Sequence, residues 1–351
     1  MRPTIGQKLV QAAIVSGLIL CLSGCYYMQA ARGQMEVMRK RVPISEVIDA
    51  EDTPPELADR LRLVREARQF SIEELGLPDN NSYRSFADLE RDYALWNVVA
   101  APEFSLEPKQ WCYPVVGCVS YRGYFDEVKA RQLGDRLQAD GYDVLVGGVA
   151  AYSTLGRFSD PILNTMMHWE DVDLVAVMFH ELAHQLIYVK DDTAFNESFA
   201  TAVEEFGIER WLLSKGQQRQ IAAYYERRDL QRRLMQLVAD ARTDLENIYA
   251  AALDDVQRRQ RKQRRLADLT SNAISEFESA GQPAQDWWSK DLNNARLASM
   301  TIYQGLLPAF RELLSRCDDE LECFYDEAEA LAKLNKDERQ ARLGALQRDY
   351  L

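Results

Sequence analysis

The sequence is poor in the side chains that bind metals through nitrogen or sulfur. Its 351 residues include only three histidines and six cysteines. No two cysteines are separated by just two residues, which argues against a cysteine zinc site or a redox motif. Positive charge is also in deficit, because 42 Lys and Arg face 55 Asp and Glu, for a formal net charge of −13. This balance argues against nucleic acid as a partner.

The N-terminal apolar run is too short for a typical membrane span. LVQAAIVSGLILCL follows Arg2 and Lys8 and is about 14 residues long, against the ~20 that a spanning helix needs. A charged start, a short apolar core and small residues before a cleavage point are typical of a secretory signal. Leu22-Ser23-Gly24-Cys25 resembles a bacterial lipobox. We therefore expect removal of residues 1–24 and lipidation of Cys25, with an uncleaved anchor as the alternative.

The expected anchor also indicates a location. The residue after Cys25 is Tyr26 rather than aspartate. Similarity to the sorting of Gram-negative lipoproteins then implies the outer membrane, with the body of the protein in the periplasm. The membrane would be one partner, reached through the N-terminal lipid.

The remaining cysteines fit an oxidising compartment. Four are left after Cys21 and Cys25 are assigned to the signal and the lipid. Such a set favours two disulfides outside the cytoplasm. Proximity along the chain favours the pairs Cys112–Cys118 and Cys317–Cys323, and free buried thiols are the alternative.

The order of segments predicts a mainly helical α+β fold, with a small sheet wrapped by long helices. Residues 93–101 and 143–154 have strand character, and residues 126–140 between them have helical character. From Asp171 the pattern is largely helical, and residues 217–280 contain no glycine or proline. We expect four parts: a signal peptide over 1–24, a tether with a helical and strand region over 25–110, a catalytic core over 111–215 and helices packing on that core over 216–351.

Two of the three histidines lie four residues apart, in VAVMFHELAHQLIYV from Val175 onward. Residues i and i+4 project from one face of a helix, so His180 and His184 can bind one metal ion. Glu181 lies beside them and can reach a water on that ion, which is the HExxH arrangement of zinc metalloproteases. The flanking residues are uncharged, as a buried active-site helix requires. His168 is expected to be structural or at the surface.

The third ligand must be an oxygen, because no histidine follows His184. Residues 190–193 have turn character, and a helical pattern resumes after them. With the hairpin midpoint at the Lys190–Asp191 bond, His184 lies 6.5 residues before it and Glu197 lies 6.5 residues after it. The two should therefore face each other across an antiparallel helix pair. Glu204, on the same helix face, is expected to orient a ligand histidine. The alternative is a pair of structural histidines beside an ordinary polar stripe.

The segments around this constellation resemble a known family. HELAHQ followed by FNESFATAVEEFG, with WCYPVVGCVSYRGYF and GGVAAYSTLGRFSDPILNT upstream, resembles the bacterial family of predicted aminopeptidases, which are zinc-dependent lipoproteins. The His/His/Glu pattern is similar to the gluzincin clan. The resemblance implies a zincin-like core, one zinc ion per chain, His180, His184 and Glu197 as ligands, and Glu181 as general base. The sequence contains no GxMEN-type segment, so end-specificity stays open.

We therefore expect a zinc-dependent peptidase of the cell envelope that acts on peptide substrates. Zinc would activate a water, and Glu181 would carry its proton to the leaving amine. Tyr303 and Tyr152 are candidate oxyanion donors, with core or wall roles as the alternative. There are two alternative hypotheses. One is a non-catalytic lipoprotein with structural zinc, and the other is a zinc amidase acting on cell-wall peptides. Glu181 favours an enzyme, because a purely structural site has no use for a base.

Overall fold

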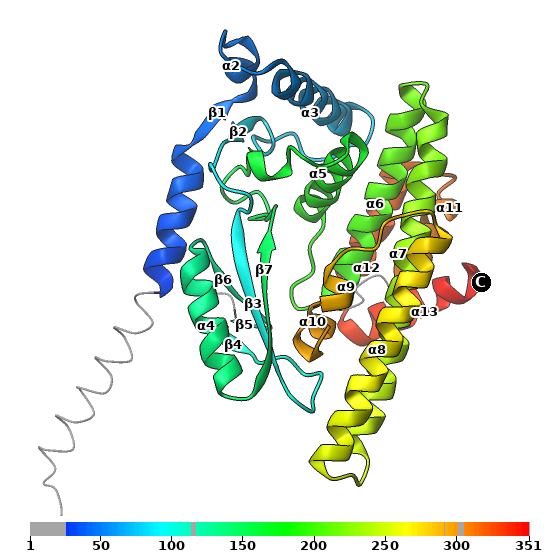
Figure 1. The fold of residues 1–351 in the computed structure, drawn as a ribbon. Coiled ribbons are helices and arrows are strands. Elements are labelled where there is room, and N and C mark those ends of the chain that lie inside the picture. The colour runs from blue at the N-terminus through cyan, green and yellow to red at the C-terminus, as the bar shows by residue number, and fades with distance from the viewer. Residues whose placement is uncertain (1–25, 114–116, 291, 301–304, 351) are drawn as a thin grey trace, which may run out of the picture.

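The structure, a computed structural model, describes residues 26–113, 117–290, 292–300 and 305–350 (Figure 1). Cys25, expected to carry lipid, and Tyr303, a candidate oxyanion donor, lie outside these ranges. Within them, no helix combines the length and the apolar character needed to cross a bilayer.

The described chain is mainly helical, with small sheets. The strands lie in the first half: β1 (Arg41–Pro43), β2 (Ser85–Ala87), β3 (Leu95–Pro102), β4 (Trp111–Tyr113), β5 (Gly117–Val119), β6 (Arg122–Tyr124), β7 (Tyr142–Val149) and β8 (Ile162–Leu163). Residues 26–39 are helical and are called the N-terminal helix below. The other α-helices are α2 (Ile44–Asp49), α3 (Pro55–Glu73), α4 (Glu127–Ala139), α5 (Asp171–Leu186), α6 (Thr193–Ser214), α7 (Gln218–Ala250), α8 (Asp255–Ser279), α9 (Trp287–Lys290), α10 (Asn294–Ser299), α11 (Leu307–Arg316), α12 (Leu321–Ala332) and α13 (Lys336–Tyr350).

A three-stranded antiparallel sheet, ordered β6-β3-β7, lies beside the helices (Figure 1). Alternate residues of β3 face opposite sides of the sheet. Val98 packs with Ala130 of α4 on one side, and Val99 packs with Ala295 of α10 on the other. The sheet is therefore covered by a helix on each face. The smaller sheets are ordered β1-β2-β8 and β4-β5.

The strand expected over residues 143–154 is shorter than predicted. It begins as β7 but ends at Val149. The Asp160 carboxylate accepts hydrogen bonds from the Thr154 amide at 2.8 Å and the Thr154 hydroxyl at 2.6 Å. These bonds hold residues 153–160 as a loop, because the backbone is tied to a side chain instead of a neighbouring strand. The expectation of a strand through Thr154 is wrong, whereas the expected strand and helix at β3 and α4 are confirmed.

The long helical region folds into an antiparallel hairpin of α7 and α8, broken near residues 251–254 (Figure 1). Its interface is apolar, with Leu234, Val238 and Leu245 of α7 against Leu269 and Phe277 of α8. The main core of the protein lies elsewhere. It joins α3, α5, α6 and the C-terminal helices α11–α13.

Two disulfides are present in the structure. Cys112 is joined to Cys118 across the β4–β5 hairpin, and Cys317 is joined to Cys323 between α11 and α12. These are the two pairs that proximity along the chain favours. Disulfides persist in oxidising compartments, so the pairing is consistent with a protein outside the cytoplasm.

The N-terminal helix docks on the body where the sequence suggested a tether. The Gln29 side chain donates to the Gly123 carbonyl at 3.2 Å and accepts from the Phe125 amide at 3.1 Å. Further along, Glu36 forms an ion pair with Arg91 at 2.9 Å. The described chain is therefore fixed to the sheet from its first helix onward.

Candidate metal centre

Helix α5 carries the two histidines on the less apolar side of a buried helix. Its residues Leu174, Met178 and Leu182 are fully buried in the main core. Because His180 and His184 are offset from this stripe, they project from α5 toward α6. The HExxH segment is helical throughout, as predicted.

The turn between α5 and α6 is held by side chains from α6. The Asp192 carboxylate caps α6 by accepting from the Phe195 amide at 3.2 Å, as its place in the turn predicts. Asn196 pairs with both backbone groups of Val189, each at 2.8 Å. Arg339 of α13 donates to the other Asp192 oxygen at 2.7 Å in a buried ion pair. These contacts fix the register in which α6 returns along α5.

That register brings three ligand-type side chains together. His180, His184 and Glu197 each offer one atom, and these atoms all lie within 4.8 Å of one another. Glu197 lies between the imidazoles, with oxygens 3.3 Å from Nε2 of His180 and 3.5 Å from Nε2 of His184. The two Nε2 atoms are 3.1 Å apart. A single cation can therefore contact all three groups after small adjustments.

Glu204 orients His180 from the other side of the ring. Its Oε2 lies 3.0 Å from Nδ1 of His180, which places the Nδ1 proton there and leaves Nε2 facing the other ligands. The second oxygen of Glu204 accepts from the Tyr224 hydroxyl at 2.8 Å and lies 3.6 Å from Arg228. By contrast, Nδ1 of His184 is buried with no hydrogen-bond partner among the described residues.

The electrostatics of the two histidines differ sharply. Burial alone would lower the pKa of His180, but hydrogen bonds with Glu197 and Glu204 outweigh it and raise this pKa to about 10. Burial and then the neighbouring His180 lower the pKa of His184 to about 4. The carboxylates of Glu197 and Glu204 thus stabilise a positive charge at His180. A metal cation can take the place of that proton, because metal ligands must be deprotonated.

Glu181 has a separate environment on the same helix. Burial raises its pKa, and His180 and the Ser153 hydroxyl counter that effect only in part. Ser153 is itself held by Asp160 at 3.3 Å. The buried Tyr83 faces the same group, since burial and then Glu181 raise its pKa. A carboxylate with a raised pKa is suited to accepting and returning a proton near neutral pH.

A cleft of about 1030 Å³ opens onto the centre. His180, Glu181 and Glu197 line it, together with Arg227 and Arg228 on the α7 side. Arg227 is 3.3 Å from Asp173 and its side chain is 40% exposed. The cleft is large enough for several residues of an extended peptide, and its α7 wall is basic.

The family described as "Putative aminopeptidase" matches residues 25–343. The chain belongs to this family. No match was found among curated proteins or among solved structures. Membership of the aminopeptidase family agrees with the His/His/Glu group seen in the geometry.

The other residues singled out from the sequence lie apart from this centre. The Tyr152 hydroxyl donates to Gln34 of the N-terminal helix at 2.8 Å, so it already has a partner other than an oxyanion. His168 is exposed and outside the metal group, with its ring against Trp169. Glu205, the residue after Glu204 on α6, also lies outside the centre: it turns away from His180 and receives two hydrogen bonds from Arg311, at 2.6 and 3.0 Å.

Sequence reasoning missed the side chains that support the centre from a distance. Tyr224 and Arg228 on α7 hold Glu204, and Ser153 and Asp160 reach Glu181 from the loop after β7. No local motif marks them, because their role depends on how separate elements dock.

Proposed function

We propose that this member of the aminopeptidase family is a zinc-dependent peptidase with a zincin-like core. The convergence of His180, His184 and Glu197 within 4.8 Å carries the proposal. Two imidazoles and a carboxylate form the donor set of catalytic zinc sites, in which the fourth position stays open. The close approach of the two Nε2 atoms, 3.1 Å apart, and of a Glu197 oxygen to each of them fits a group that needs a cation.

Each residue around the centre has a separate role in hydrolysis. Zinc held at this centre would lower the pKa of water toward 7 and polarise the scissile carbonyl. Glu181 accepts the proton of the attacking water and delivers it to the leaving amine. Glu204 keeps His180 in the tautomer that a ligand requires.

The substrate is a peptide that lies along the basic α7 wall of the cleft. Arg227 on this wall keeps 40% of its side chain exposed beside Asp173, and guanidinium groups recognise carboxylates well. This wall supports peptides with free carboxylates, and it is also the observation that favours the second candidate. That candidate is a zinc amidase acting on cell-wall peptides, which uses the same chemistry.

The place of action that we propose is the periplasmic face of the outer membrane. The two disulfides support a location outside the cytoplasm, and the lipobox-like segment supports an anchor at Cys25. Cys25→Ala should leave an unprocessed precursor that migrates more slowly on a gel, because the signal is removed only from a lipidated chain. Normal processing and normal membrane retention of this variant would reject the anchor.

The decisive test of hydrolysis is Glu181→Gln. The variant keeps the shape of the side chain but removes a base, so cleavage of a peptide library should fall by about 10²–10⁴-fold. Metal content should stay at the wild-type level, because Glu181 is not a ligand. Cleavage is read by mass spectrometry, with and without a chelator.

The matched control is Glu170→Gln, the same change at the exposed start of α5. It should leave both cleavage and metal unaffected. Absence of any chelator-sensitive cleavage in the wild type would favour a structural zinc protein. Unchanged turnover in Glu181→Gln would refute this mechanism.

A further inference from the structure

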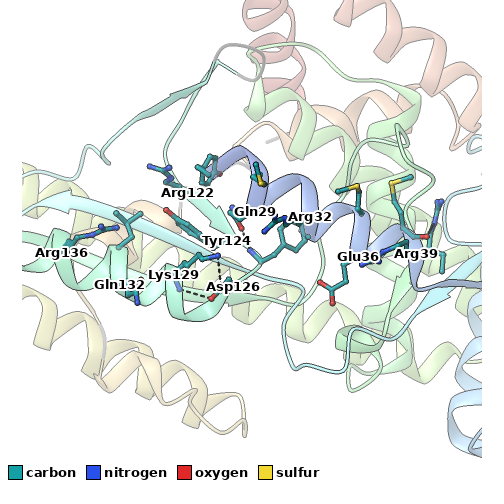
Figure 2. Close-up of a pocket in the computed structure, with 18 residues that line it drawn as sticks. Gln29, Arg32, Glu36, Arg39, Arg122, Tyr124, Asp126, Lys129, Gln132 and Arg136 are labelled. Atoms are coloured by element: carbon teal, nitrogen blue, oxygen red, sulfur yellow. Dashed lines mark hydrogen bonds and ion pairs between the residues drawn. The ribbon is translucent and has the colours of Figure 1, made fainter. Parts of the chain in front are cut away.

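A second large cavity lies far from the metal centre along the chain's first helix. It is a groove of about 1440 Å³ between the N-terminal helix and α4 (Figure 2). Figure 2 shows Arg32, Glu36 and Arg39 along the N-terminal helix and Lys129, Gln132 and Arg136 along α4. Neither the family nor the proposed peptidase activity gives this groove a role.

The groove is basic although the protein as a whole is acidic. Six cationic side chains line it against two acidic ones; the cations are Arg32, Arg39, Arg41, Arg122, Lys129 and Arg136. Both acids have partners, since Glu36 pairs with Arg91 at 2.9 Å and Asp126 with Lys129 at 3.2 Å. In a chain with a net charge of −13, this is a local concentration of positive charge.

Three of the cations are available to a ligand. Arg32, Arg39 and Arg136 are exposed, and none makes an ion pair or side-chain hydrogen bond with the residues that the structure describes. Figure 2 shows Arg32 and Arg39 on the N-terminal helix and Arg136 on α4, toward the opposite end of the groove from Arg39, so both walls offer positive charge to an anionic group. Arg122, near the base of the groove, stacks on Tyr26 at 4.1 Å, and its Nε is buried without a hydrogen-bond partner among the described residues.

The walls are rigidly joined, so the groove is preformed. The side-chain amide of Gln29 donates to the Gly123 carbonyl in β6 and accepts from the Phe125 amide just after β6. Gly33 lies directly against Phe125, where an added Cβ would come within 2.0 Å of the ring. The absence of a side chain at residue 33 therefore lets the two helices approach. A preformed site loses little entropy when a ligand binds.

Apolar side chains accompany the cations on the N-terminal helix. Tyr27, Met28 and Met35 are 42%, 54% and 53% exposed, and both methionines line the groove. A free phosphate would use the cations alone. Exposed apolar and basic residues on one helix are typical of segments that lie at the surface of a bilayer. The mixture therefore favours a lipid over a soluble anion.

We propose that this groove binds the phosphate headgroup of an anionic phospholipid. Such binding would place the N-terminal helix and α4 against the membrane. Figure 1 shows both on the opposite side of the molecule from the α7–α8 hairpin, whose helix α7 lines the metal cleft. Lipid binding in this groove would depend neither on peptidase activity nor on lipidation of Cys25.

The test uses the full chain in neutral detergent and native mass spectrometry to measure bound lipid. The probes are phosphatidylglycerol, phosphatidylcholine and inorganic phosphate. Each basic residue near an anionic lipid surface contributes a factor of about five in affinity. Arg32→Gln combined with Arg136→Gln removes one cation from each wall and should weaken phosphatidylglycerol binding by roughly 30-fold. Phosphatidylcholine and phosphate should bind weakly to every form.

The matched control is Arg261→Gln with Arg264→Gln, which removes the same charge from exposed positions of α8. It should bind phosphatidylglycerol like the wild type. An equal loss of phosphatidylglycerol affinity in both double variants would show a non-specific charge effect and overturn the site. Unchanged affinity in both double variants would overturn it as well. Tight binding of inorganic phosphate alone would identify a phosphate site and reject the lipid. If the first variant misfolds, Arg39→Gln with Lys129→Gln repeats the test.

Discussion

Two antiparallel helix pairs in this protein have opposite kinds of interface. Between α5 and α6 lie two histidines and the carboxylates of Glu197 and Glu204, of which His184 and Glu204 are buried. Between α7 and α8 the chain buries an apolar stripe of leucine, valine and alanine against leucine and phenylalanine. Burial of apolar surface stabilises a fold, whereas burial of charged groups costs free energy unless they are paired. The first pair is built for a ligand and the second for stability.

The two helix pairs meet where the start of α7 packs against α6, and there residues of α7 support the metal centre. Tyr224 and Arg228, near the start of α7, both reach the Glu204 carboxylate. Burial lowers the pKa of Arg228, but the attraction of Glu204 outweighs burial and leaves this pKa raised, so Arg228 stays charged. The rest of α7 packs on α8. Changes in the α5–α6 pair should therefore affect metal, and changes deep in the hairpin should affect only folding.

The largest expected effect is loss of the metal from His184→Ala. Two remaining ligands hold zinc poorly, so metal analysis of the purified variant should find it essentially metal-free. The fold should tolerate the change, because Nδ1 of His184 has no hydrogen-bond partner among the described residues. His168→Ala, at an exposed histidine, is the control and should retain full metal. Full occupancy in His184→Ala would disprove the assignment.

Sequence reasoning located this centre because its signals are local. The spacing of His180 and His184 and the turn before Asp192 are enough to place Glu197 opposite the histidines, and the structure brings these side chains together. The contribution of Tyr224 could not be predicted, because it depends on the angle at which α7 docks on α6. The early end of β7 has a local cause instead, because the Asp160 carboxylate, six residues after Thr154, takes the Thr154 hydrogen bonds. Local patterns determine the elements and some of their ends, whereas docking determines which elements become neighbours.

The next effect separates two glutamates on α6. Glu197→Gln should weaken metal binding severely, since an amide replaces a charged ligand. Glu204→Gln should weaken it by about 10–100-fold, the usual cost of losing a group that orients a ligand histidine. Competition with a chelator of known affinity measures both.

The control for this pair is the adjacent Glu205→Gln. Glu205 faces Arg311 instead of the histidines, so its loss should lower the melting temperature without a change in metal affinity. If Glu204→Gln lowered the metal affinity more than Glu197→Gln, Glu204 would be the ligand and Glu197 the residue that orients a histidine.

The smallest expected effect on the metal comes from the hairpin. Leu245 is fully buried between α7 and α8, so Leu245→Ala should lower the free energy of unfolding by about 2–5 kcal/mol through lost burial and a residual cavity. Metal content and chelator competition should match the wild type, because Leu245 lies about six helical turns from Tyr224 at 3.6 residues per turn. Leu213→Ala, at a half-exposed position, should change stability by less than about 0.5 kcal/mol. Urea unfolding combined with metal analysis distinguishes the outcomes. A folded Leu245→Ala protein with weakened metal binding would show that the two helix pairs act as one unit, and the contrast between a ligand-binding pair and a stabilising pair would fail.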